Sequence, residues 1–269
     1  YGMKDFFRDK FDEIDLNSFN LGKIIGGFDV HTKTYVVSLQ NNNNVDYDTL
    51  AFDESVKGWV SRYSYKPDQI FSLKNNYFTT FSGGAENFNG LYKHYFGSEY
   101  GKFYGVNVDS SVTTVFNPKV SLSKNFLTIG YEGSNGWEMN DFRSDFTGVD
   151  NGINFDDVTF PVKSYDEGEF VINPATGQPV RPADYQATFG TPYPPYNKMR
   201  AGFNRKENKY VSNLKNNSMP RPGEIVYAQS LSGVKGMFAT VVFSIDSTTN
   251  ITGKKELFAV SSTYVESSY

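Results

Sequence analysis

The sequence predicts an all-β protein of antiparallel sheets with one short N-terminal helix. Three observations favour this fold class. Aromatic residues make up 17% of the 269 residues, including 24 Phe and 19 Tyr, and such side chains fit the half-buried surface of a sheet. Segments that alternate apolar and polar residues recur about every ten residues, without helical patterns between them. The 24 glycines and the asparagine run at 41–44 supply many turn positions.

The first predicted elements lie between residues 3 and 65. Phe6, Phe7, Phe11 and Ile14 share one face of a helix over residues 3–15, which predicts a short amphipathic helix. Strands are expected at 23–29, at 34–40 and within 52–65, where Lys66-Pro67 ends the regular structure. A Tyr-led strand, a polar loop and a Trp-bearing strand in this order are similar to one blade of a β-propeller. We therefore expect partial propeller-like blades.

The remaining strands follow the same alternating pattern. They are expected at residues 69–73, 77–81, 91–96, 102–108, 112–116, 124–131, 198–204, 209–214, 224–228, 236–245 and 257–265. The last two are apolar and separated by a polar stretch at 246–253, which predicts an antiparallel hairpin.

Composition divides the chain into four parts. Residues 161–196 hold seven of the 11 prolines, which a sheet interior does not accommodate, so this segment is interpreted as an extended linker or as an arm that lies across a neighbour. The other parts are an N-terminal helix or arm at 1–20, propeller-like blades at 21–160 and a C-terminal β module at 197–269. The first residue is Tyr, which indicates a fragment or a processed product.

One internal similarity supports a modular arrangement. A Gly-Phe strand, polar turn and Tyr-Val strand at 23–42 recurs at 198–217, although two such hairpins also arise by chance. Large aromatic residues in these hairpins, in the Trp-bearing strand and near residue 137 are the predicted structural core: Phe28, Tyr35, Phe52, Trp59, Tyr63, Trp137, Phe203 and Tyr210.

Charge and cysteine content limit the possible functions. The net charge of −4 and the isoelectric point near 5.3 argue against a dedicated nucleic-acid binder, which carries a basic face, yet they allow a conduit through which DNA slides. There is no cysteine, hence no disulfide or thiolate metal site. No apolar run reaches the roughly 20 residues that span a bilayer, so we expect no membrane insertion.

No catalytic, cofactor-binding or metal-binding residues are predicted. The chain has two histidines, His31 in an expected surface turn and His94 in an aromatic strand, where we expect a packing role. No phosphate-binding loop or nucleophile-elbow motif is present, and the acidic residues between 145 and 157 lack the spacing of a calcium loop. An alternative is a sugar- or base-stacking platform, although strand alternation places about half of its residues in the core. Its members are Tyr63, Tyr65, Phe71, Tyr77 and Phe78.

Four stretches together resemble a known family. They are the Ile-Gly-Gly-Phe-Asp strand at 25–29 with the Tyr-Val-Val-Ser-Leu strand at 35–39; residues 52–67; Val-Phe-Asn-Pro at 115–118 with the Tyr-Glu-Gly-Ser-Asn-Gly-Trp segment at 131–137; and the terminus at 255–269. These stretches resemble the C-terminal part of tail nozzle, or muzzle, proteins in crAss-like and related tailed bacteriophages.

The resemblance implies a non-enzymatic structural protein of the virion. It implies a β-propeller-based hexameric ring that lines the DNA exit channel below the portal. Its partners would be further copies of the chain, the rest of a polyprotein, neighbouring tail proteins and, transiently, genomic DNA. We expect the Pro-rich arm and the terminal strands to reach neighbouring copies. The alternatives are a tail-tip or fibre module that binds host glycans, and a tail-associated glycosidase.

Overall fold

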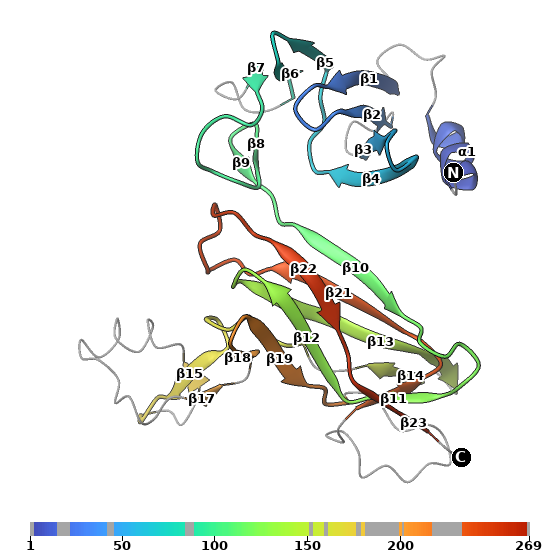
Figure 1. Ribbon diagram of the computed structural model, residues 1–269, viewed down its shortest axis with the longest axis vertical. Coiled ribbons are helices and arrows are strands. Elements are labelled where there is room, and N and C mark those ends of the chain that lie inside the picture. The colour runs from blue at the N-terminus through green and yellow to red at the C-terminus, as the bar shows by residue number, and fades with distance from the viewer. Residues whose placement is uncertain are drawn as a thin grey trace. The chain divides into compact units, whose positions relative to one another are not determined.

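The computed structural model describes residues 3–14, 22–41, 46–83, 89–150, 153–158, 161–175, 179–180, 199–200, 202–216 and 233–267. These residues form antiparallel sheets and one short N-terminal helix, which confirms the predicted fold class (Figure 1). No closed propeller forms among the described strands. The chain divides into two compact units, Tyr1–Val108 and Asp109–Tyr269, and the boundary falls inside the segment expected to hold the blades. The four-part division by composition stays a prediction.

Unit 1 begins with helix α1 (Lys4–Glu13) and a four-stranded meander in the order β1-β2-β3-β4. Its strands are β1 (Lys23–Asp29), β2 (Thr34–Gln40), β3 (Tyr47–Asp53) and β4 (Gly58–Tyr63). Asp29 starts the first hairpin turn, because its Oδ1 accepts a 2.8 Å hydrogen bond from the backbone N–H of His31. Asp53 accepts the backbone N–H of Ser55 at 2.8 Å in the same way between β3 and β4.

A second sheet of unit 1 packs against β1. It contains β5 (Gln69–Leu73), β6 (Asn76–Phe81) and β7 (Gly90–Lys93), followed by the short hairpin of β8 (Lys102–Phe103) and β9 (Val106–Asn107). Residues 102–108 are therefore two strands and not the single predicted one, because Tyr104 and Gly105 have φ of 51° and 82° and form a tight turn. Val36, Ala51, Tyr65, Ile70 and Tyr77 form the core between these elements with Tyr104.

Unit 2 packs two main sheets face to face. One has the order β10-β21-β13-β14 and the other β18-β19-β12-β22. In β21 every second residue is buried, from Ala239 to Ile245, as expected for a strand with one face on the core. The strands are β10 (Ser111–Phe116), β21 (Ala239–Ile245), β13 (Trp137–Asp150), β14 (Ile153–Val158), β18 (Asn204–Lys206), β19 (Lys209–Asn213), β12 (Thr128–Gly133) and β22 (Leu257–Ser261).

A three-stranded sheet continues the second of these sheets. It contains β20 (Val234–Gly236), β11 (Lys124–Phe126) and β23 (Tyr264–Glu266) in the order β20-β11-β23. The predicted strand at 124–131 is thus interrupted at Leu127, whose N–H donates to the carbonyl of Thr263 at 2.8 Å. Residues 257–266 therefore run antiparallel to residues 124–133 along almost their whole length.

The predicted hairpin of the last two long strands is wrong. β21 pairs with β10 and β13, whereas β22 pairs with β12 in the opposite sheet. The two segments cover the core from opposite sides, and the chain crosses between the sheets after Asp246. That carboxylate accepts the backbone N–H of Thr248 at 3.0 Å and turns the chain.

The described start of the Pro-rich segment belongs to unit 2. Val162 and Val171 are buried, and β15 (Glu169–Ile172) pairs with β16 (Pro179–Val180) and β17 (Met199–Arg200). Residues 161–175 therefore do not form an extended linker. Residues 181–196 and the strand predicted at 224–228 lie outside the described residues.

Candidate functional site

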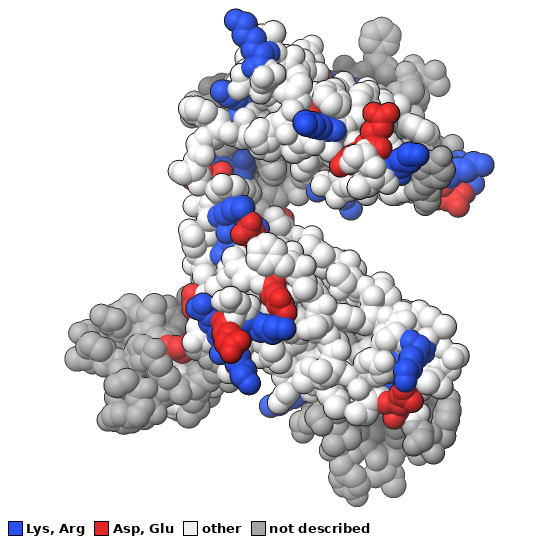
Figure 2. Space-filling model, viewed as in Figure 1, with Lys and Arg blue, Asp and Glu red and all other residues white. Residues whose placement is uncertain are grey.

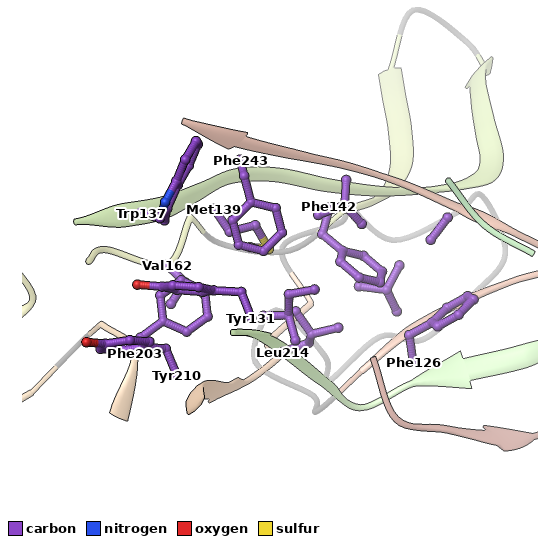
Figure 3. Close-up of a cluster of buried hydrophobic side chains, with 14 of the residues drawn as sticks. Phe126, Tyr131, Trp137, Met139, Phe142, Val162, Phe203, Tyr210, Leu214 and Phe243 are labelled. Atoms are coloured by element: carbon purple, nitrogen blue, oxygen red, sulfur yellow. The ribbon is translucent and has the colours of Figure 1, made fainter. Parts of the chain in front are cut away.

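Three of the predicted core residues lie in the core of unit 2. Trp137, Phe203 and Tyr210 are almost completely buried. The ring of Tyr131 stacks on Tyr210 with centroids 4.7 Å apart and meets the edge of the Phe203 ring at 5.0 Å. Figure 3 shows this cluster with Phe243 and Met139 on the opposite sheet. These residues hold the two sheets of unit 2 together.

Four further predicted core residues form one row across the meander of unit 1. Phe28 pairs with Tyr35, Tyr35 with Phe52, and Phe52 with Trp59, so all four side chains point to the same face. Helix α1 covers the Trp59 end, where the Phe7 and Trp59 ring centroids are 4.9 Å apart. Trp59 and Phe52 are accordingly partly buried.

The other end of this row departs from the expected core placement. Phe28 is 49% exposed and Tyr35 is 50% exposed. Only one face of a strand points inward, and the inward positions of β1 and β2 near this end are Asp29, Thr34 and Val36, of which Asp29 and Val36 are fully buried. Large aromatic side chains alone did not reveal which face turns inward.

Strand β10 is an open edge of unit 2. It pairs with β21 on one side, and no described strand pairs with its other side. The Ile245 N–H donates to the Ser110 carbonyl at 3.0 Å, and alternation along an antiparallel pair then turns the N–H and C=O of Ser111, Thr113 and Val115 outward. The sequence Ser-Val-Thr-Thr-Val-Phe has neither a charge nor a proline, and Figure 2 shows uncharged surface along this strand. Natural edge strands normally carry charged residues or prolines, which prevent pairing with other chains.

The consecutive strands β22 and β23 form another open edge of unit 2. Among the described strands, both pair only with the β12 and β11 side of their sheets. Phe258 is 72% exposed, and no charge or proline occurs between Leu257 and Val265. The pairing of β22 with β12 is irregular at its start, where the register shifts between Glu132 and Gly133. At the other end of this edge, Glu266 forms an ion pair with Lys119. The stretch between them offers unpaired backbone groups.

Unit 1 contains a cavity of about 400 Å³ walled by aromatic rings. Its walls include Tyr63, Tyr65, Tyr92, Tyr95, Tyr100, Phe103 and Tyr104, together with both histidines. His31 lies in the exposed turn as predicted but stacks on Tyr95 with centroids 4.1 Å apart. His94 packs 5.0 Å from the Tyr65 ring. The first and last of these residues, His31 and Tyr104, are more than 60 positions apart in the sequence. The packing of β7 and the β8–β9 hairpin brings them together.

Hydrogen bonds fix the walls of this aromatic cavity. The Tyr95 hydroxyl donates to Asp29 Oδ2 at 2.6 Å, and the Tyr104 hydroxyl donates to Thr79 Oγ1 at 2.9 Å. Thr79 Oγ1 also lies 2.7 Å from His94 Nε2. Burial lowers the pKa of His94 to about 4, against the opposing effect of Asp29, so its imidazole is neutral at neutral pH.

The predicted stacking platform does not form a single surface. Tyr65 and Tyr77 are buried, with their hydroxyl oxygens 3.0 Å apart, and burial raises the pKa of both. Phe71 and Phe78 are a cross-strand pair that stacks on the outer face of β5 and β6 at 5.6 Å. Of these five residues, Tyr63 and Tyr65 line the aromatic cavity, and Tyr63 is partly exposed.

Among the described residues, no group of three or more His, Cys, Asp or Glu side chains is placed to hold a metal ion. Nor does the described part of the chain contain a helix long and apolar enough to cross a membrane. Asp145, from the acidic stretch, accepts the backbone N–H of Met237 at 2.6 Å and thus has a structural contact.

Residues 98–217 match the family described as the Crassvirus muzzle protein C-terminal domain. The matched segment includes β10–β19 and therefore much of the framework of unit 2. The match confirms the resemblance to muzzle proteins, and the matched segment contains the motifs at 115–118 and 131–137. No curated protein shows a significant match to the chain.

Proposed function

We propose that this chain, in which residues 98–217 match the Crassvirus muzzle protein C-terminal domain, is a structural component of the virion whose copies form a ring around the channel through which the genome leaves the tail. Six copies are expected from the resemblance to tail nozzle proteins. The neighbouring tail proteins and the rest of a longer polyprotein are its further partners in this proposal.

Two open edges of unit 2, β10 and the β22–β23 edge, carry this proposal. A ring of identical subunits requires a heterologous interface, in which two different surfaces of neighbouring copies meet. β10 and β22 belong to different sheets, and each offers unpaired backbone groups without the charges or prolines that prevent strand addition. We propose that β10 of one copy pairs with the β22–β23 edge of the next.

The charge of the chain supports passage of DNA and not its retention. A net charge of −4 gives no basic track for phosphates. A mildly acidic channel wall repels the DNA backbone and lets it slide. Contact with genomic DNA is therefore transient in this proposal, and no reaction is assigned to the chain.

Cross-linking in the virion tests the ring. Because the chain has no cysteine, Val115→Cys in β10 combined with Val265→Cys in β23 introduces the only two thiols. A short bismaleimide should link these edges between copies and yield a ladder that ends at the ring size. Val56→Cys is the matched control, because Val56 is 65% exposed in a turn of unit 1. Virions that carry one copy per particle, or no ladder with the edge variant, would refute the proposal.

A further inference from the structure

The aromatic cavity of unit 1 has the size and rigidity of a small-molecule site. Its volume of about 400 Å³ lies within the range of roughly 300–1,000 Å³ that is typical for such sites. Tyr95 and Tyr104 are held by hydrogen bonds from their hydroxyls to Asp29 and Thr79. A ligand that enters therefore meets preformed ring surfaces, and little side-chain freedom is lost on binding.

The exposed part of the wall is also aromatic. Tyr100 is 52% exposed and Phe96 is 79% exposed, and both line the cavity. The Lys93 ammonium group lies 5.2 Å from the centroid of the Phe96 ring, a cation–π contact. Such rings are an unfavourable surface to leave in water without a partner.

The charges at the entrance are balanced. The Lys102 ammonium group pairs with Glu99 at 2.9 Å, and the remaining two charges are Lys93, which lines the cavity, and Asp29, which is completely buried behind Tyr95. Nucleic-acid sites that stack bases also provide a basic groove for phosphates, and this entrance provides none. The balance favours a ligand without net charge.

We propose that this aromatic cavity binds one unit of a neutral carbohydrate. A sugar ring has an apolar C–H face, which packs on an aromatic ring, and hydroxyl groups at its edge, which hydrogen-bond to polar and charged side chains. The cavity offers both, with Tyr100 and Phe96 as the packing surfaces and Glu99 and Lys93 as the hydrogen-bonding groups. This inference is independent of the ring proposed above, because it concerns residues of unit 1 alone.

Saturation-transfer NMR on the full chain tests the proposal. The probes are the methyl glycosides of glucose, galactose and mannose at concentrations on the order of 10 mM. We expect transfer to the C–H protons of at least one of them. Tyr100→Ala and Phe96→Ala should each weaken binding about tenfold. Tyr35→Ala is the matched control, because Tyr35 is equally exposed but lies on the outer face of the meander, and it should bind as the parent does.

Three results would overturn the proposal. The first is no transfer to any neutral glycoside. The second is transfer that survives both Tyr100→Ala and Phe96→Ala in protein whose Trp59 fluorescence shows that unit 1 is folded. The third is binding of thymidine or of methyl glucuronide in preference to every neutral glycoside, which would assign the cavity to bases or to acidic ligands.

Discussion

Replacement of Thr113 by proline tests the proposed assembly role of β10 separately from the role of this strand in the fold of unit 2. Thr113 is exposed in the middle of the strand, and its N–H points away from β21. Proline is tolerated in an edge strand where the missing N–H faces solvent. Thr113→Pro should therefore leave the free energy of unfolding of unit 2 within about 1 kcal/mol of the parent.

The expected effect on assembly follows from the lost hydrogen bond. The substitution removes the central outward donor of β10 and leaves a carbonyl of the partner strand unpaired. A missing bond with an unsatisfied partner costs about 1–3 kcal/mol. This corresponds to about 5-fold to 150-fold weaker association at each interface. Because every interface of a ring carries the same change, closed rings should be lost before dimers are.

The assay is the concentration dependence of particle mass for the purified full chain, measured by sedimentation. Thr113→Ala keeps the N–H and should assemble as the parent does. Val112→Pro removes a donor that faces β21 and should lower the stability of unit 2 by about 3 kcal/mol, which shows that the two faces of the strand differ. Thr113→Pro protein that assembles with the same midpoint as the parent would refute the use of this edge.

Three further predictions concern stability, and the two tryptophans, one in each unit, allow each unit to be followed separately. Phe243→Ala should destabilise unit 2 by about 3–5 kcal/mol, because Phe243 is fully buried and packs against Tyr131 and Phe203. Urea unfolding followed by Trp137 fluorescence in a Trp59→Phe background measures this change. A loss of stability below about 1 kcal/mol would contradict the core assignment. Trp59→Ala should cost only about 2 kcal/mol, since Trp59 is partly buried, and should expose α1 to proteolysis; unchanged cleavage in residues 3–14 would contradict docking of the helix on Trp59. The stability of unit 1 should fall as the pH drops from 6.5 to about 4, because the unfolded chain binds a proton at His94 in this range and the folded chain does not. The difference between the unfolded and folded pKa of His94 corresponds to at most about 3 kcal/mol. In urea titrations followed by Trp59 fluorescence, His94→Gln should remove this part of the pH dependence. An equal pH dependence in the parent and the variant would contradict the role of His94.

Local alternation was enough to predict several strands of unit 1. β1, β2 and β5 have the bounds expected from the sequence, because each is bounded by a turn that Asp29 or neighbouring Asn and Lys residues define. Which strands pair across long distances did not follow from such patterns. The pairing of β21 with β10 and β13 depends on which sheet covers which side of the core, and neither strand carries a local sign of its partner.

The internal similarity shows how the same pattern leads to different packing. Phe28 and Tyr35 are opposite each other and half exposed, whereas in the second copy Tyr210 is opposite Arg205 and both Phe203 and Tyr210 are buried. The pairing differs by two residues between the hairpins, which leaves the alternation of faces unchanged, so burial follows which face of the hairpin packs on the core and not the residue type. For the same reason the aromatic cavity could not be assembled from the sequence: Tyr63, Tyr65 and Phe103 carry similar patterns to Phe71 and Phe78, which face the other way.

The pairing of residues 257–266 with residues 124–133 sets the order in which the protein matures on the ribosome. Glu256 and Ser134 are joined by a hydrogen bond although 122 residues separate them. The described strands of unit 1 have all been synthesised by residue 107, so their pairing within this unit can be complete early in translation. Unit 2 remains without the outer strand of one sheet until Leu257 and the residues after it emerge, and during that interval β12 and β11 are themselves exposed templates for aggregation.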